Sequence, residues 1–295
     1  MNKANSKLPQ RIFQEVKEWS WLIPSLAGVL VFYVIPFCVV IYYSVLDNPI
    51  FKRFVGLNNF LSLFKNESFL TACKNTAIFT VIAVPLSVVL ALFIAMALEA
   101  KIPGKSLIRT CFLCPMMVPI ASVVLVWQVI FHMHGSLNQF IGMFGAQPVD
   151  WLKSSWSYMV LTIMFLWKTL GYNMILFMSA LGGIPKDILE VASLEGASPA
   201  YTFFHIKLRY LSPTILFVTI LSVMSSFKMF REVYLLTGDY PSPNVYLLQH
   251  FMNNTFNSLD YQKLSSAAVL LAVLMAVIMG VLFFLERKLG EDVEE

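Results

Sequence analysis

Six long stretches of this chain are almost free of charged residues, and their length decides what the chain can fold into. A helix needs about 20 mostly apolar residues to cross the hydrocarbon core of a bilayer, which is about 30 Å thick. Helices also satisfy their own backbone hydrogen bonds in lipid. The sequence therefore predicts an all-α membrane protein with six transmembrane helices in a single domain, residues 1–295. The predicted spans are residues 19–46, 75–98, 110–131, 156–181, 210–230 and 264–285.

The composition supports this prediction and excludes a soluble enzyme. Apolar residues make up 58% of the 295 residues and charged residues 13%, against about 45–50% and about 25% in soluble domains. The net charge of +4 is too small and too scattered to indicate nucleic acid binding. The first stretch is too long for a cleaved signal peptide and lacks a small-residue cleavage pattern, so we expect a true span.

The distribution of Lys and Arg predicts the orientation. If both termini lie in the cytoplasm, the inner segments carry 12 of these residues and the outer loops carry 7. Because Lys and Arg favour cytoplasmic loops, the expected topology is N-in and C-in. Lys168 and Lys228 are the charges expected inside spans, whereas every acidic residue is expected in a loop, a tail or a span end.

No arrangement of residues in the sequence indicates catalysis or a metal site. Gly104-Lys105-Ser106 resembles the end of a phosphate-binding loop, but position 99, where that loop needs a glycine, is Glu99. Cys111 and Cys114 form a Cys-x-x-Cys within a predicted span, where we expect them to pack as small apolar residues. We therefore predict no catalytic residue, no metal ligand and no cofactor on this chain, which favours transport.

The loop at residues 183–209, between the fourth and fifth spans, is predicted to form two short helices. Asp187 can cap the first helix, with Glu190 three residues later as a capping-box partner. Gly196 can end that helix, and Ser198-Pro199 can begin the second as its N-cap and first-turn proline. The first helix is too short to span a membrane, and small residues near its end let another surface approach. The loop is therefore predicted to insert into a cleft of a cytoplasmic partner.

This loop resembles the cytoplasmic coupling loop of permease subunits in bacterial binding-protein-dependent ABC importers. The family pattern is Glu-Ala-Ala, three residues, Gly, nine residues and Ile-x-Leu-Pro. Val191 replaces one Ala and Arg209 replaces the Pro, and neither departure changes the spacing. The matching residues are Glu190, Ala192, Gly196, Ile206 and Leu208.

The rest of the chain is similar to the sugar-importer branch of this family, which includes the maltose and glycerol-phosphate permease subunits. The resemblance extends over most of the chain, from the start of the second span to the end of the fifth. The residues that carry it are Asn75-Thr76, Arg109 to Pro119, Trp127, Gly135-Ser136-Leu137-Asn138, Trp167, Gly171, Leu181, Phe227, Phe230, Leu236-Thr237-Gly238 and Pro241.

The resemblance implies a multi-pass permease of the bacterial cytoplasmic (inner) membrane that imports a carbohydrate by ATP-driven alternating access. Its implied partners are a second permease subunit, a cytoplasmic ABC ATPase dimer that holds ATP and Mg, and an extracytoplasmic solute-binding protein. Glu190 is expected to meet a basic group of the ATPase, with a capping-box role alone as the alternative. The implied docking residues are Glu190, Ala192, Ser193, Glu195, Gly196, Ala197 and Ile206.

Polar and aromatic residues within the spans are candidates for the sugar pathway. A Lys at the centre of a membrane helix costs about 2.5–3.5 kcal/mol on insertion scales, so we expect Lys168 to face a wet cavity or the bundle interior. The alternatives are a snorkelling lysine and an internal pair that joins helices, and the other candidates could equally hold helices together. The candidates are Trp127, Gln128, Lys168, Tyr172, Asn173, Ser225 and Lys228.

Two other classes of protein remain as alternatives. A secondary transporter tends to carry Asp or Glu within its spans for ion coupling, and the sequence places none there. A membrane-embedded enzyme, such as a lipid-modifying transferase, needs a catalytic constellation, and no such pattern is present. The importer permease is therefore the favoured hypothesis.

Overall fold

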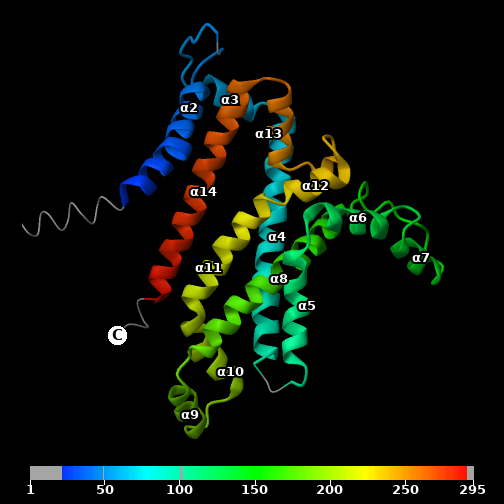
Figure 1. Ribbon diagram of the computed structural model, residues 1–295, viewed down its shortest axis with the longest axis vertical. Helices are drawn as coiled ribbons and strands as arrows, with labels where there is room; N and C mark the ends of the chain where they lie inside the picture. The colour runs from blue at the N-terminus through cyan, green and yellow to red at the C-terminus, as the bar shows by residue number, and fades with distance from the viewer. Residues whose placement is uncertain (1–21, 49, 100–101, 291–295) are drawn as a thin grey trace, which may run out of the picture. The chain divides into compact units, whose positions relative to one another are not determined.

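The computed structural model describes residues 22–48, 50–99 and 102–290. Within these ranges the regular structure is helical, apart from one isolated antiparallel bridge. Six of the described helices are long and apolar enough to cross a membrane (Figure 1). The predicted all-α class with six transmembrane helices is thus confirmed. Residues 19–21 of the first predicted span lie outside the described residues.

The boundaries of the membrane helices agree best with prediction where a helix is buried on several sides. Helix α8 (Ser157–Gly182) lies within one residue of its predicted bounds. Helix α4 (Glu67–Ala97) begins well before residue 75, because the Asn66 side chain accepts a hydrogen bond from the Phe69 N–H at 3.0 Å and caps the helix there. The six candidate spans are Leu22–Ser44, Glu67–Ala97, Ile120–Gly142, Ser157–Gly182, Pro199–Thr237 and Tyr261–Arg287.

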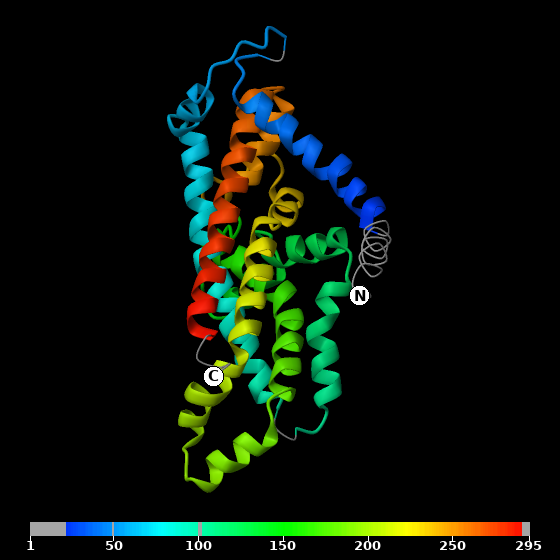
Figure 2. The same cartoon turned by 90° about the vertical axis from the view of Figure 1, so that its left-hand side faces the viewer.

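The predicted third span, residues 110–131, is divided into two helices in the structure. Helix α5 (Lys105–Met117) ends before Pro119, and α6 (Ile120–Phe131) begins after it. Proline lacks a backbone N–H and forces the preceding residue out of the helical region, and Val118 is accordingly extended, with ψ 131°. Figures 1 and 2 both show α6 turning away from the direction of α5.

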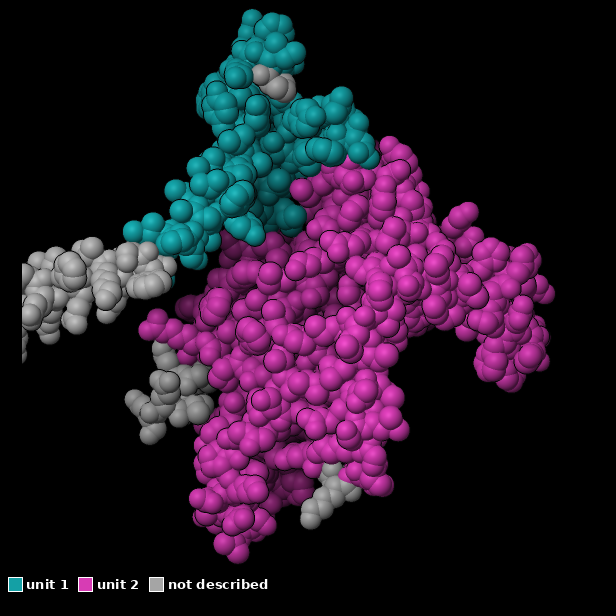
Figure 3. Space-filling view, viewed as in Figure 1, with its two compact units in different colours: residues 1–65, 255–272 teal, residues 66–254, 273–295 magenta. Residues whose placement is uncertain are grey.

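The chain forms two compact units, coloured separately in Figure 3. The first contains residues 1–65 and 255–272, with η1 (Leu30–Val34), α2 (Ile35–Ser44) and α3 (Asn58–Phe64). Its centre is a set of hydrogen bonds at the end of α2. The Asn59 amide donates to the carbonyls of Ser44 and Leu46 at 2.9 and 2.7 Å, and the Ser266 hydroxyl donates to the Ser44 carbonyl at 3.2 Å. The predicted single domain stays a prediction.

The core of the second unit, residues 66–254 and 273–295, is the packing of α4, α5 and α11 (Leu208–Phe227) against α8. Phe79 and Phe165 meet edge to face with ring centroids 5.6 Å apart, and both are buried. A Cβ at Gly171 would lie 1.8 Å from the Phe112 carbonyl oxygen. This glycine therefore lets the backbone of α5 lie directly against α8.

A buried asparagine and threonine in α4 hold the segment that contains η3 (Pro243–Val245). The Asn75 amide donates to the Pro243 and Tyr246 carbonyls at 2.6 and 3.0 Å, and its oxygen accepts from the Tyr158 hydroxyl. The Thr76 hydroxyl accepts from the Leu248 N–H at 2.9 Å. These contacts explain the Asn-Thr pair that the sequence places in the second span.

Asn138, in α7 (Ser136–Gly142), organises the loop that follows α6. Its amide nitrogen donates to three backbone carbonyls, among them that of Val149 at 2.8 Å. Its oxygen accepts from the Val149 N–H and from the Trp151 indole N–H at 2.9 Å. Gly135 precedes this helix in a turn so tight that a Cβ would lie 2.3 Å from the Val129 carbonyl oxygen. The remaining helices are α12 (Phe230–Thr237), α13 (Leu248–Asn257) and α14 (Tyr261–Gly290).

The first and last candidate spans differ from the central ones in burial. In the most apolar 18-residue stretches of Leu22–Ser44 and Tyr261–Arg287 no residue is buried. In the corresponding stretch of Ser157–Gly182, 44% of the residues are buried. Their exposed apolar side chains suit contact with lipid chains or with another membrane helix.

Candidate functional site

Of the two short helices predicted for the loop between α8 and α11, the first is present as a separate helix, α9 (Lys186–Leu194). The second is not separate, because α10 (Pro199–Tyr201) continues through the π-helical η2 (Thr202–Lys207) into α11. We call residues 183–209 the short-helix loop. In both ribbon views it lies at the end of the second unit opposite α12 (Figures 1 and 2).

The start of α9 differs from the prediction. Pro185, with ψ 127°, occupies the N-cap position, and no side chain caps the helix. Asp187 therefore lies inside the first turn, where its charge complements the helix dipole, and the predicted capping box with Glu190 is wrong. Within the described residues, the exposed Glu190 side chain makes no hydrogen bond, which leaves it available to a partner.

The end of α9 confirms the role predicted for Gly196. This residue has φ +78°, and its N–H donates to the Ser193 carbonyl at 3.1 Å. The Ala197 N–H donates to the Ala192 carbonyl at 2.9 Å, which completes the two bonds of a Schellman motif. As predicted, Ser198 then caps α10, because its hydroxyl accepts from the Tyr201 N–H at 3.2 Å.

The surface of α9 combines exposed apolar side chains with a carboxylate. Leu194 is 87% exposed and Val191 is 53% exposed, beside the exposed Glu190. Lys207 joins the short-helix loop to the end of the α4 segment, through an ion pair with Glu99 at 2.7 Å. Of the other predicted docking residues, Ser193, Glu195 and Gly196 are exposed, Ala197 and Ile206 are half-buried, and Ala192 is buried.

Lys168 forms an ion pair whose partner the sequence did not indicate. Its ammonium group donates to Oε1 of Glu232 in α12. The Glu232 side chain is only 3% exposed, and it lies near the end of the candidate span Pro199–Thr237, beyond residue 230, where the fifth span was expected to end. The buried face of α12 continues at helical spacing from Met229 through Glu232 to Val233. This helical spacing of residues beyond residue 230 is the sequence pattern that could have predicted a buried position for Glu232.

The ion pair lies beside a cavity of about 150 Å³ between the α5–α6 break, α8 and α12, which we call the charge-pair cavity. Trp127 and Trp167 meet edge to face there, with ring centroids 5.7 Å apart. The residues that line it are Pro115, Met116, Val118, Ile120, Val123, Trp127, Met164, Trp167, Lys168, Met229 and Glu232.

The other predicted pathway residues do not line this cavity. The Asn173 amide donates to the Ser222 hydroxyl at 2.9 Å in the bundle core. The Gln128 amide donates to the Leu235 carbonyl at 3.4 Å. Tyr172 and Lys228 are exposed, and Ser225 is half-buried. The structure thus brings Trp127 and Lys168 together, whereas the pathway role of the whole set stays a prediction.

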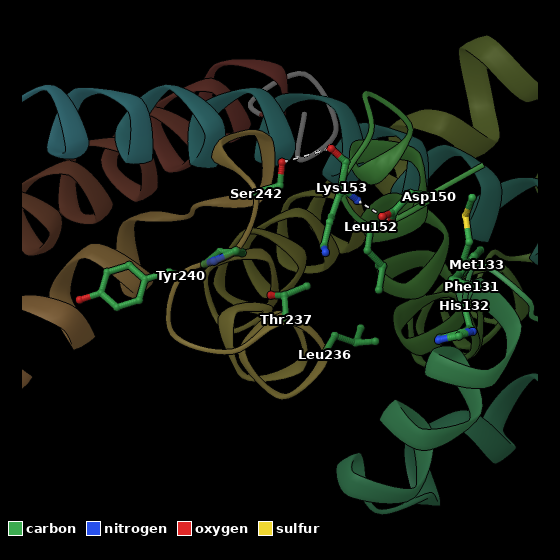
Figure 4. A pocket seen from close by; sticks show the side chains of 11 residues that line it. Phe131, His132, Met133, Asp150, Leu152, Lys153, Leu236, Thr237, Tyr240 and Ser242 are labelled. Atoms are coloured by element: carbon green, nitrogen blue, oxygen red, sulfur yellow. Dashed lines mark hydrogen bonds between the residues drawn. The ribbon is translucent and has the colours of Figure 1, made fainter. Parts of the chain in front are cut away.

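A second cavity, of about 400 Å³, lies between the loop after α6 and the segment after α12 (Figure 4). The Asp150 carboxylate accepts from the Lys153 N–H at 3.2 Å, and the Ser242 hydroxyl approaches the Lys153 carbonyl at 3.4 Å. Figure 4 shows the Lys153 side chain extending from this wall toward Thr237. The cavity is open and its charged side chains are exposed.

The titratable groups of the described residues do not form a metal site or a disulfide. No group of three or more His, Cys, Asp or Glu side chains is placed to hold an ion in the described part of the chain. The four cysteines, all described, are free thiols. Burial lowers the pKa of His250, in α13, to about 4, although the charge of Asp239 acts in the opposite direction. His250 is therefore neutral near pH 7, and its Nδ1 accepts from the Leu247 N–H at 3.2 Å.

Comparison with known families gives a match over most of the chain. Residues 83–293 match the family described as binding-protein-dependent transport system inner membrane component. The trehalose/maltose transport system permease protein MalF of Thermococcus litoralis is 29% identical over 278 residues, which cover 92% of this chain and 93% of that protein.

Other relatives have similar coverage. The sn-glycerol-3-phosphate transport system permease protein UgpA of Yersinia enterocolitica is 29% identical, over 92% of this chain and 96% of its own. The lactose transport system permease protein LacF of Rhizobium radiobacter is 28% identical, over 96% and 97%. A solved bacterial ABC transporter for import of the acidic polysaccharide alginate has a chain of the same fold. Its TM-score is 0.83 at 19% identity, over 96% of this chain and 99% of that chain.

Proposed function

The chain belongs to the family of inner membrane components of binding-protein-dependent transport systems, and on that basis we propose that it is the permease subunit of an ABC importer that moves a carbohydrate into the cytoplasm. Three relatives that cover almost the whole chain are named for transport of trehalose and maltose, sn-glycerol-3-phosphate, and lactose. The family description also implies a solute-binding protein that delivers the substrate.

Helix α9 supports the further proposal that a cytoplasmic ATPase docks on the short-helix loop. The helix ends in a defined backbone motif and presents Leu194, Val191 and Glu190 to solvent. Exposed apolar side chains beside an unpaired carboxylate suit a groove lined by apolar residues and a basic group. Glu190 then forms a charge-assisted hydrogen bond with the ATPase.

The proposed docking also has consequences for the other partners and for the orientation of the chain. If the short-helix loop faces the cytoplasm, both termini do so as well, in agreement with the bias of Lys and Arg. A second permease subunit completes the pathway, and the ATPase pair supplies the bound ATP and Mg, so that this chain needs no cofactor. The apolar, unburied faces of the first and last candidate spans provide surface for that subunit and for lipid.

The decisive experiment replaces Glu190 by Ala in the complete importer. Loss of a hydrogen bond to a charged group costs about 1.5–3 kcal/mol, so we expect copurification of the ATPase and substrate uptake to fall by about tenfold or more. Because Glu190 is exposed and makes no internal hydrogen bond, the thermal unfolding temperature of the permease purified without the ATPase should not change.

Glu67→Ala provides the matched control, because Glu67 is also exposed and helical but lies in the first turn of α4, away from the short-helix loop. This variant should copurify with the ATPase and transport normally. Normal copurification and normal transport in Glu190→Ala would refute the docking role.

A further inference from the structure

Glu232 carries an unpartnered oxygen at a buried position. Its Oε1 accepts from Lys168, but within the described part of the chain its Oε2 is buried without a hydrogen-bond partner. A buried charged oxygen without a partner is costly, and a native structure rarely leaves one so. The residue also lines the charge-pair cavity. The cavity therefore contains an acceptor that a hydrogen-bond donor on a ligand could satisfy.

Lys168 adds donors to the same wall. An ammonium group has three N–H donors, and one of them is directed to Glu232. The Lys168 side chain is 40% exposed, so the other donors can reach a ligand in the cavity. The cavity thus offers both an acceptor and donors within one ion pair, which matches a ligand with neighbouring hydroxyl groups.

The remaining walls suit the apolar face of a ring. Trp127 and Trp167 present indole rings, with methionine and branched aliphatic side chains around them. A cavity of about 150 Å³ is several times the volume of one water, about 30 Å³, and an engineered cavity of about that size binds benzene. The charge-pair cavity therefore has room for one six-membered ring.

The Lys168–Glu232 ion pair also favours a neutral ligand over a charged one. The ammonium of Lys168 and the carboxylate of Glu232 cancel, so a neutral ligand leaves the site neutral. A ligand with a carboxylate or a phosphate would bring an uncompensated negative charge next to Glu232 into a region of low dielectric, which is costly.

We propose that the charge-pair cavity binds one ring of a neutral sugar during transport, and that the Lys168–Glu232 pair discriminates against acidic or phosphorylated saccharides. The sugar packs against the indole wall while one hydroxyl donates to Oε2 of Glu232 and another accepts from Lys168. This inference rests on the proposed function and narrows it, since the named relatives include transporters of both neutral and anionic solutes.

The test uses the complete importer in liposomes, with uptake of labelled maltose, lactose and a uronic acid disaccharide measured for each variant with the same solute-binding proteins. Glu232→Gln keeps the shape of the side chain but removes its charge. We expect the KM for the neutral sugar that the wild type transports to rise by about tenfold or more. We also expect the ratio of neutral to acidic uptake to fall, because Lys168 then leaves the cavity positive.

Arg231→Gln is the matched control, since it removes a charge from the adjacent, exposed position outside the cavity. Its KM and its uptake ratio should equal those of the wild type. The exchange variant Lys168→Glu with Glu232→Lys keeps the pair neutral, and it should keep the preference for neutral sugar even if Glu232→Gln fails to assemble.

The possible results separate this inference from the function on which it rests. If the wild-type importer, with active ATPases, transports none of these saccharides or those of a wider panel, the proposed carbohydrate function is wrong. If it transports a sugar but takes the acidic saccharide as readily as the neutral one, the function stands and the inference fails. The inference also fails if Glu232→Gln and Arg231→Gln give the same KM and ratio, or if the exchange variant loses the preference.

Discussion

The short-helix loop and the charge-pair cavity lie in the same compact unit but are built in opposite ways. The loop is defined by bonds between residues close in sequence, such as those that place Gly196 and Ala197 after α9. The cavity is defined by contacts between distant residues, since Lys168 and Glu232 are 64 positions apart. The loop exposes its carboxylate, whereas the cavity buries one.

This difference separates two kinds of sensitivity to mutation. Removing a side chain from the exposed loop should change association with a partner and leave folding nearly unaffected. Removing one member of the buried pair should change both folding and transport, because it leaves an uncompensated charge. The contrast is therefore wrong if a variant of the loop loses folding stability, or if a variant of the ion pair keeps its folding and its transport.

The largest effect is expected from Lys168→Met. This variant leaves the buried carboxylate of Glu232 without its cation. Breaking a fully buried pair costs about 3–5 kcal/mol, and we expect the lower end of that range or less because the Lys168 side chain is 40% exposed to solvent. We expect a clear decrease in the thermal unfolding temperature of the purified assembly. Because the cation is also proposed to contact sugar, uptake should fall together with stability.

The double variant Lys168→Met with Glu232→Met separates the missing cation from general disruption of the site. Replacing both members of a buried pair by apolar residues is often neutral for stability, so the unfolding temperature should recover while transport stays low. An unchanged unfolding temperature in Lys168→Met would show that the pair does not support the fold.

A smaller effect is expected from Gly171→Ala, which tests the packing beneath the cavity. A Cβ at this position would lie 1.8 Å from the Phe112 carbonyl oxygen, so α5 must move away from α8. Overpacking of this kind costs about 1–3 kcal/mol, and the unfolding temperature should fall accordingly.

Gly182→Ala in the same helix is the control for that variant. No atom lies within 4 Å of a Cβ at Gly182, and alanine is the better helix former by up to about 1 kcal/mol. Its unfolding temperature should be equal to or above that of the wild type. Similar losses in both variants would contradict the close contact between α5 and α8.

The same contrast explains which parts of the molecule could be predicted from sequence. The long apolar stretches predict six membrane helices because burial in lipid depends mainly on length and composition. The end of α9 was predictable because a glycine after a short helix can adopt the left-handed conformation that ends it, which depends only on neighbouring residues. The start of α9 was predicted wrongly, because Pro185 rather than Asp187 occupies the N-cap position.

The cavity could not be predicted in this way. Lys168 is an unusual charge within a predicted span, and an internal ion pair is one of the interpretations that the sequence allows. The sequence does not show which residue would be the partner in that pair. Hydropathy falls after the fifth span and therefore places Glu232 outside it, although α12 continues the buried face. The break at Pro119 is hard to predict because prolines are tolerated inside membrane helices, and that break forms part of the cavity wall.

A smaller loss of stability than that of Gly171→Ala is expected from Gly196→Ala in the short-helix loop. Gly196 has φ +78°, a conformation that costs an L-residue with a Cβ roughly 1–2 kcal/mol, and no other atom hinders a Cβ there. Gly196→Asn should cost less, because asparagine tolerates this region better. Since the glycine sets where α9 stops, even this modest strain should redirect Glu190 and reduce ATPase copurification, more for Ala than for Asn. If Ala and Asn bind the ATPase equally well and as tightly as the wild type, the backbone motif does not position the docking surface, and the loop owes its function to side chains alone.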